Sequence, residues 1–242
     1  MALVLLGRGV AVAYRPFVST DAAVADRGEL DIEFGYAGFR QNGGRTTIVA
    51  PTVIGNIGLG HDLELVGEFK LANDLARRKE HDSVRIEDSA ISVKWVAREG
   101  NLQEKGPGPS LGVELSALLP TVRGEDQLGG ELIGIASGAA LGWTYHVNAG
   151  GVIVPGSHAP GPVWGVIVEH VLRGRLRAVA EVNGESAAGS AATNSALVGT
   201  IWELEAPPPI HALSLDVGVR HGISRAADTW GGTAGFTVTF PW

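Results

Sequence analysis

Hydrophobic and polar residues alternate along most of this chain. In the stretch that begins at residue 29, Leu30, Ile32 and Phe34 share one face, and Asp31 and Glu33 lie between them. A repeat of two residues places successive side chains on opposite faces of a β-strand. Seven segments show this pattern clearly: 29–39, 63–70, 89–98, 110–119, 175–186, 212–220 and 231–242. Five weaker segments lie at 46–57, 132–141, 144–154, 163–171 and 195–202. The pattern therefore predicts about twelve strands of about ten residues each.

The length of these segments and the chemistry of their faces favour a membrane barrel. Strands of soluble proteins usually have five or six residues, whereas strands that cross a membrane need about nine to eleven. In lipid every backbone polar group must pair within the protein, so a sheet can cross only as a closed barrel. We expect an all-β fold, a closed antiparallel up-and-down transmembrane β-barrel of about 12 strands in a Gram-negative-type outer membrane, in contact with its lipid. The alternation also fits a soluble sandwich with its apolar faces inside, and the sequence does not fix which face points outward.

The predicted connections support this barrel in part. A barrel with both termini in the periplasm has short turns on that side and longer loops outside. The short connections expected on the side of the termini lie at 59–62, 142–143 and 172–174, and the longer outer ones at 73–87, 121–130 and 221–229. The connections at 98–109 and 203–211 fall on the side of the termini and are longer than this rule prefers.

Residues 132–154 allow a second interpretation. They contain no Asp, Glu, Lys or Arg, and Gly134, Gly138 and Gly142 are spaced like the packing glycines of membrane helices. A single transmembrane helix is therefore the alternative to two strands. Polar residues such as Asn148 fit a spanning helix poorly, and one helix would leave the alternating segments unexplained, so we favour the strands.

The composition excludes several classes of protein. The 242 residues include 35 glycines and no cysteine, which removes disulfide scaffolds, thiol catalysis and cysteine metal sites. The abundance of glycine disfavours a helical bundle. The formal net charge of −7, from 26 acidic and 19 basic residues, argues against nucleic acid as a partner. A mean hydropathy of +0.14 agrees with a membrane protein.

The N-terminal residues divide into two parts before the barrel. Residues 1–13 form an apolar run that ends in Ala11, Val12 and Ala13, the pattern that precedes a signal-peptide cleavage site. Arg8 interrupts this run and a basic start is missing, so we expect a truncated signal peptide, with a first strand or a loose end as the alternative. Residues 14–28 are expected in the periplasm or inside the lumen, where they could act as a plug. Residues 29–242 form the predicted barrel domain.

Several segments, in this order, resemble the outer-membrane, transporter-like protein family named for the meta-pathway of phenol degradation. They are RGELDIEFGY at 27–36, LGHDLEL at 59–65, VKW at 93–95, LLPT at 118–121, AEVNGES at 180–186 and LDVGVRHG at 215–222. The resemblance covers nearly the whole chain after Asp26 and implies an outer-membrane barrel with a role in the uptake of small, hydrophobic or aromatic compounds. The family supplies no catalytic motif to transfer.

No catalytic or metal site is predicted, and no cofactor is expected. The seven histidines show no pair with the close spacing of a metal site. Ser214, His146 and Asp216 could form a Ser–His–acid set from distant strands, but sets of this kind arise by chance among so many polar residues. His61 and Asp62 are typical of a turn. An outer-membrane hydrolase therefore remains a minor alternative.

The charged residues of the polar faces are the candidate functional residues. If these faces line a lumen, its lining includes Asp31, Glu33, Glu64, Glu68, Lys94, Glu114, Arg177, Glu181, Asp216 and Arg220, together with Lys70 and Glu185. These charges could form a ring that selects solutes, mildly for cations, or a paired network that fills a narrow barrel. At about twelve strands both interpretations stay open.

Aromatic residues lie near the predicted strand ends, where the girdles of membrane barrels are found. These are Trp95, Trp143, Trp202, Trp230, Phe240 and Trp242. The terminal Trp242 also resembles the residue that such barrels present to the barrel-insertion machinery during biogenesis. Taken together, the sequence predicts a channel or transporter for passive or facilitated passage of small solutes. A non-conducting structural or partner-binding barrel is the alternative.

Overall fold

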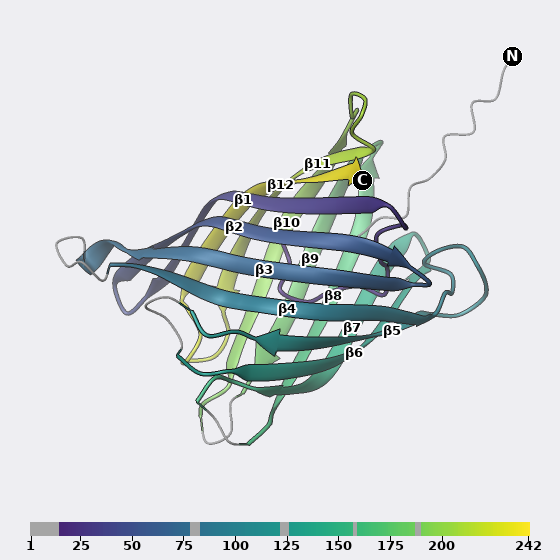
Figure 1. The fold of residues 1–242 in the computed structure, drawn as a ribbon. Helices are drawn as coiled ribbons and strands as arrows, with labels where there is room; N and C mark the ends of the chain where they lie inside the picture. Colours follow the sequence, from purple (N-terminus) through teal and green to yellow (C-terminus); the bar gives the residue numbers. More distant parts are fainter. Residues whose placement is uncertain (1–14, 78–82, 122–125, 157–158, 187–189) are drawn as a thin grey trace, which may run out of the picture.

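The protein folds as one closed barrel. The structure, a computed structural model, describes residues 15–77, 83–121, 126–156, 159–186 and 190–242. Within these residues each strand pairs antiparallel with the next, and the last strand pairs with the first (Figure 1). The strands are β1 Glu29–Asn42, β2 Arg45–Gly60, β3 Leu63–Asp74, β4 Val84–Arg98, β5 Ser110–Leu118, β6 Gly129–Ala140, β7 Trp143–Ile153, β8 Gly161–Arg173, β9 Leu176–Glu185, β10 Thr193–Leu204, β11 Ala212–Gly222 and β12 Trp230–Pro241. The prediction of about twelve antiparallel strands is confirmed.

The pairing of β1 with β12 closes the wall. It runs from Glu29 opposite Pro241 to Gln41 opposite Trp230. We call the end where β1 begins and β12 ends the terminal end, and the opposite end the loop end. Because the wall is closed, it leaves no unpaired sheet edge within the apolar band.

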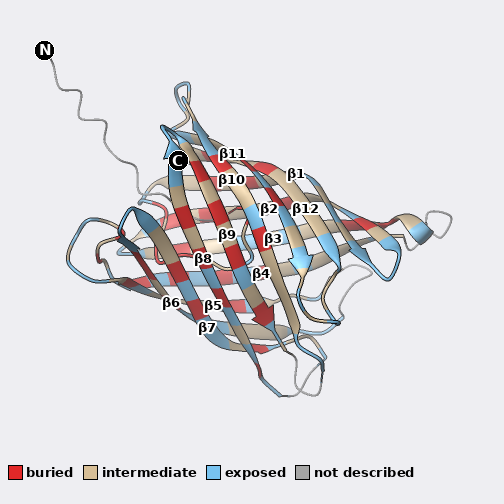
Figure 2. Cartoon of the chain, turned by 180° about the vertical axis from the view of Figure 1, so that it is seen from behind, coloured by how far each residue is buried: buried red, intermediate tan, exposed pale blue. Residues whose placement is uncertain are grey.

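The apolar face of the strands points outward. On β11, the exposed fraction is 38% for Leu215, 51% for Val217 and 48% for Val219, whereas Asp216 between them is 6% exposed. Figure 2 shows the same alternation of exposed and buried bands along neighbouring strands. An apolar exterior around a polar interior is the arrangement of a barrel in hydrocarbon, and a soluble fold would have the opposite one. The alternative of a soluble sandwich with an apolar centre is therefore excluded, and the expected barrel is confirmed.

Residues 132–154 are not a helix. They lie in β6 and β7, which are joined by a tight turn at Leu141 and Gly142, with φ of 54° and 80°. These left-handed conformations are those of a two-residue hairpin turn. The part of the chain that the structure describes contains no helix long and apolar enough to cross a membrane.

The turns at the terminal end are mostly tight. His61 and Asp62, with φ of 56° and 59°, join β2 to β3 as the sequence predicted. The connections 99–109 and 205–211 are the long exceptions at this end. The predicted outer loop 73–87 is shorter than expected, because β3 continues to Asp74 and β4 already begins at Val84.

Exposed aromatic residues lie at both rims. Trp95, Trp202 and Trp242 lie near the terminal end, and Trp230 begins β12 at the loop end, each at least 46% exposed. Trp143 also lies near the terminal end, where its ring stacks on His170 with 4.6 Å between ring centroids. Amphipathic rings at the two rims mark the levels at which a membrane interface would lie.

Candidate functional site: the lumen and its N-terminal segment

The lumen of the barrel contains part of the chain itself. Residues 15–28, which we call the N-terminal segment, precede β1 and run inside the wall. Asp21 and Ala22 have no exposed surface, and Ala23 and Ala25 are 4% and 6% exposed. These short side chains allow the segment to pack closely against the inner faces of the strands. The expected region 14–28 is thus lumenal over its described part.

Side chains of β9 and β7 hold the loop-end half of the segment. The Glu181 carboxylate accepts hydrogen bonds from the backbone N–H groups of Val18, at 3.1 Å, and Ser19, at 2.7 Å. Asn148 Oδ1 accepts the Thr20 N–H at 2.9 Å, and its Nδ2 donates to the Thr20 carbonyl at 2.8 Å. Backbone groups that would pair in a sheet are here satisfied by the wall.

A second group of contacts holds the half near the terminal end. Ala22 N–H donates to Ser137 Oγ at 2.8 Å, and Ala25 N–H donates to Glu64 Oε2 at 2.6 Å. Gln103, in the connection between β4 and β5, donates from Nε2 to the Ala22 carbonyl at 2.6 Å. The segment is therefore bonded to β3, β6, β7 and β9 and to a turn at the terminal end.

Ion pairs reinforce this attachment. Arg15 Nε lies 3.3 Å from Asp216 Oδ2, and Lys94 Nζ lies 3.2 Å from Glu64 and 3.7 Å from Asp21. Lys94 is 1% exposed, so its charge is compensated inside the protein. Removing one partner would leave a buried charge unpaired, which is strongly destabilising.

Glycines make room for the segment in the wall. A Cβ atom added to Gly165 would lie 1.8 Å from Ser19 Oγ, and one added to Gly58 would lie 2.0 Å from the Asp26 carbonyl oxygen. Neither distance is compatible with a side chain unless the segment moves. These close approaches show that the segment is an integral part of the packed interior.

His146 links Ser137, a partner of the segment, to Glu169 on β8. Its Nδ1 lies 2.9 Å from Ser137 Oγ, and its Nε2 lies 3.1 Å from Glu169 Oε1. Glu169 also forms an ion pair with Arg177. The chance set of His146 with Ser214 and Asp216 is not assembled, because both ring nitrogens of His146 have other partners and Asp216 pairs with Arg15. Because Ser137 and His146 have no exposed surface, this network stabilises the packed interior of the barrel.

The terminal-end half of the lumen is filled. Each strand from β1 to β10 contributes at least one inward side chain with 2% or less of its surface exposed: Glu33, Asn56, Glu64, Lys94, Ser110, Ser137, His146, Glu169, Glu181 and Leu197. Within the described residues, the wall and the segment therefore pack closely against each other around these side chains.

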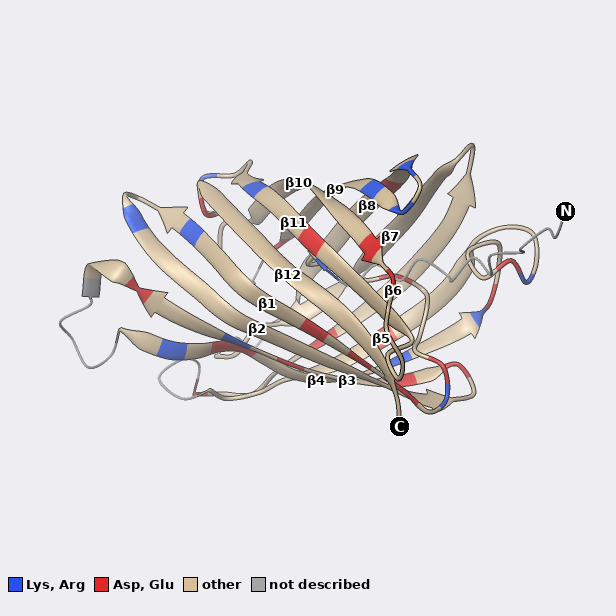
Figure 3. Ribbon diagram, turned by 90° about the horizontal axis from the view of Figure 1, so that it is seen from above, with Lys and Arg blue, Asp and Glu red and all other residues tan. Residues whose placement is uncertain are grey.

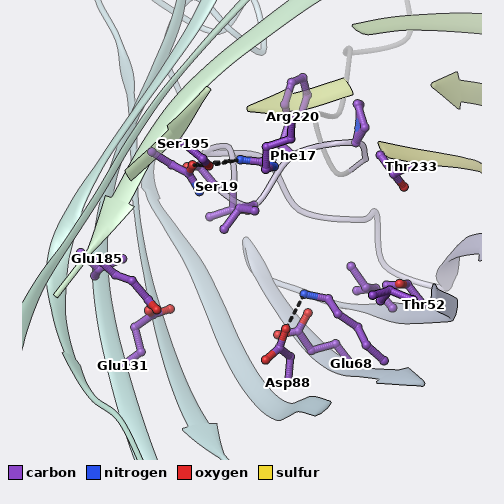
Figure 4. Close-up of a pocket in the computed structure, with 18 of the residues that line it drawn as sticks. Phe17, Ser19, Thr52, Glu68, Asp88, Glu131, Glu185, Ser195, Arg220 and Thr233 are labelled. Carbon is purple, nitrogen blue, oxygen red and sulfur yellow. Dashed lines mark hydrogen bonds and ion pairs between the residues drawn. The ribbon is translucent and has the colours of Figure 1, made fainter. Parts of the chain in front are cut away.

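The loop-end half contains an open cavity, which we call the vestibule. Its volume is about 810 Å³. Its floor is formed by Arg15–Thr20 of the segment, and its walls reach the loop ends of β3, β6, β9 and β11 (Figure 4). Apolar side chains such as Phe17, Ile133 and Val163 line it together with charged groups. Charged and polar side chains make up about half of this lining, so the cavity presents polar groups and apolar surface together.

The structure divides the predicted lumen-lining charges between these two regions. Figure 3 shows charged positions within strands, such as the acidic band on β11, and not only in loops. Glu33, Glu68, Lys94, Glu114 and Arg220 line the vestibule. The others are buried below it or beside the segment: Asp31, Glu64, Arg177, Glu181 and Asp216. They do not form one open ring, because the segment occupies the level at which such a ring would lie.

Some residues of this site were not predicted from the sequence. Ser137, Asn148, Glu169 and Gln103 hold the segment or its network. Their partners lie far away in sequence, although the pairing of β6 with β7 places Ser137 directly opposite His146. Among the described residues, no group of three or more His, Asp or Glu side chains could hold a metal ion.

Comparisons with known proteins find similarity in architecture only. No family model and no curated protein matches the chain. Among solved structures, the translocator domain of autotransporter NalP from Neisseria meningitidis is 11% identical, with 90% of each chain covered and a TM-score of 0.45. The CymD monoaromatic hydrocarbon channel is 10% identical, covering 90% of this chain and 89% of that chain, also at 0.45. OmpF from Salmonella typhi, in complex with daunomycin, is 10% identical, covering 88% and 97%, at 0.40. At these identities and TM-scores the likeness supports no conclusion about function. The assignment of a barrel fold depends on the strand pairing within this structure.

Proposed function

We propose that this protein is an outer-membrane barrel that admits small solutes through its loop end and controls their passage with its own N-terminal segment. The observation that carries the proposal is the vestibule of about 810 Å³, open toward the loop end and floored by residues 15–20. No covalent step and no cofactor are part of this function.

The proposed location follows from the exterior of the barrel. Side chains such as Leu115, Val198 and Val217 are 62%, 64% and 51% exposed, and a continuous apolar surface of this kind is unfavourable in water. Closed walls of long strands with an apolar band are characteristic of barrels in outer membranes. Lipid is then the partner of the exterior, and the barrel-insertion machinery is the expected partner during biogenesis.

The proposed passage requires the segment to move. Below the vestibule, residues such as Glu64 and Ser137 are completely enclosed, so a solute cannot continue toward the terminal end while the segment is in place. Apart from Phe17, which packs against Val179, Leu197 and Ile201, the segment is held by hydrogen bonds and ion pairs, which can be exchanged for water without breaking the wall. The uptake of aromatic compounds, which the family resemblance implies, remains a prediction about the solute.

Conductance in planar bilayers tests this function. We expect the full chain to show rare, small openings, and a variant lacking residues 16–25 to show a steady conductance several times larger. The contradicting result is a folded deletion variant that neither conducts nor admits small solutes into vesicles.

A non-conducting barrel that binds a solute or partner in its vestibule is the second candidate. The filled terminal-end half of the lumen favours it, because narrow barrels are stable when their interior is packed. If the deletion variant stays silent while the vestibule still binds small molecules, this second function is the correct one.

A further inference from the structure

The basic side chains around the vestibule are already engaged. Lys70 Nζ lies 2.9 Å from Asp88, Arg220 lies 2.6 Å from Glu181, and the Arg40 guanidinium lies 2.8 Å from Glu87. A cation that is paired at these distances attracts an incoming anion weakly, because its charge is largely compensated. The vestibule therefore offers no free positive charge on these three side chains.

Acidic side chains of the vestibule are not compensated in the same way. Among the described residues, Glu68, Glu131 and Glu185 form no ion pair within 4.0 Å, although all three line the cavity. In Figure 4 the carboxylates of Glu131, from β6, and Glu185, from β9, point toward one another, and these two groups interact electrostatically. When both carboxylates are ionised they repel each other, and either a proton on one of them or a cation between them relieves this repulsion.

A buried carboxylate at the floor of the vestibule, that of Glu33, also favours a positively charged ligand. Glu33 lines the vestibule, has no exposed surface and accepts one hydrogen bond, from Asn56 at 2.9 Å. Its second oxygen, Oε2, has no hydrogen-bond partner. A buried carboxylate oxygen without a partner is costly, and positive charge brought into the cavity would offset part of that cost.

Apolar residues frame the carboxylate pair. Val152 lies opposite Glu131 in the register of β6 and β7, and Val163 lies opposite Glu185 in the register of β8 and β9. Both valines line the same cavity. A ligand that fills this part of the vestibule therefore meets carboxylates and aliphatic surface together.

We propose that the vestibule binds small organic cations, namely ammonium ions that carry an apolar or aromatic group. The ammonium group would lie between Glu131 and Glu185, and the apolar group would contact the valines and Phe17. Low-dielectric walls concentrate the field of the carboxylates inside such a cavity. The cavity is far larger than a bare metal ion, and the described residues offer no metal-ligating cluster, so an organic cation fits better than an inorganic one. The inference rests on the proposed function only in that the vestibule is the entrance for solutes.

Equilibrium binding to the full chain in detergent tests this site without requiring conduction. The probes are benzylammonium, benzyl alcohol and benzoate, which share one ring and differ in charge. Isothermal titration calorimetry should show benzylammonium binding about tenfold or more tightly than benzyl alcohol, with no binding of benzoate. The affinity should fall as salt is raised from 0.05 to 0.5 M, because salt screens the carboxylates.

Two isosteric variants locate the effect. Glu131→Gln and Glu185→Gln should each weaken benzylammonium binding about tenfold and leave benzyl alcohol unchanged. Glu104→Gln is the matched control, since Glu104 is an exposed carboxylate in the connection between β4 and β5 at the other end of the barrel. A heat-modifiable shift on gels verifies that each variant is folded.

The outcomes separate this inference from the proposed function. Equal affinity for the three probes, tighter binding of benzoate, or full affinity in both glutamine variants would overturn the organic-cation site, whatever the bilayers show. If the barrel binds benzylammonium as expected but never conducts, the organic-cation site is supported and the proposed passage of solutes is contradicted.

Discussion

At the scale of single residues, Glu181 carries much of the attachment of the N-terminal segment. Its carboxylate accepts hydrogen bonds from Val18, Ser19 and Arg220, while the side chain itself is 1% exposed. Hydrogen bonds to a buried charge contribute more than neutral ones, because an unsatisfied partner cannot turn to water. The loss of this one group should therefore loosen the segment without disturbing the strand ladder.

Glu181→Gln tests that dependence. The amide retains one carbonyl oxygen and loses the charge. The free energy that stabilises the segment in its lumenal position should therefore decrease by about 1–3 kcal/mol. Amide hydrogen exchange at Val18 and Ser19 should accelerate at least about tenfold, which corresponds to 1.4 kcal/mol. Glu104→Gln serves as the control, and unchanged exchange in the Glu181 variant would contradict the assignment.

Gly165 provides a steric test of the same contact. A Cβ at this position would lie 1.8 Å from Ser19 Oγ, so Gly165→Ala should displace the segment and increase proteolysis before β1. Ser19→Ala removes the clashing oxygen and should restore much of the protection in the double variant. Gly67→Ala is the matched control, since a Cβ there meets nothing within 4 Å. Equal protease resistance of all variants would mean that the segment does not lie against β8.

At the scale of elements, the strands were predictable, whereas the sequence left the segment between the periplasm and the lumen and did not identify its partners. Alternation in residues such as Leu215, Asp216 and Val217 is local information, so it fixed the strand and its two faces. The glycine-rich β6 and β7 alternate weakly, which is why a helix remained open. The segment depends on contacts such as Arg15 with Asp216, which are 201 residues apart. The short side chains of the segment follow no local pattern from which partners so distant in sequence can be predicted.

A disulfide can fix the segment to the wall, because the chain has no natural cysteine. A Cβ added to Gly112 on β5 would lie 3.6 Å from the Ala22 Cβ, within the range of disulfide-bonded cysteines. The double variant Ala22→Cys/Gly112→Cys should form the bond under oxidising conditions, as thiol titration would show. Its conductance should be abolished when oxidised and return with a reductant, while the single variants stay unaffected. Openings of the same size and frequency in the oxidised form would exclude movement of the segment as the gate.

At the scale of the whole molecule, the outward apolar band determines where the protein is stable. Val217 lies in the middle of β11 and is 51% exposed, so Val217→Arg would place a charge in hydrocarbon. Folding into lipid vesicles should become less favourable by about 2–4 kcal/mol. Ile223→Arg, just beyond β11 and 59% exposed, should have little effect. Gel shifts during refolding measure the difference, and equal refolding of both variants would mean that the band does not contact lipid.

The location of the segment's partners has a consequence for the order of assembly. The groups that hold residues 15–25 come from β3, β6, β7, β9 and β11, and Arg15 also donates to Thr233 on the last strand. During biogenesis this complete set of groups exists only after β12 has joined β1. The first residues that the structure describes are thus the last to reach their final positions, and their docking marks a barrel whose circumference is complete.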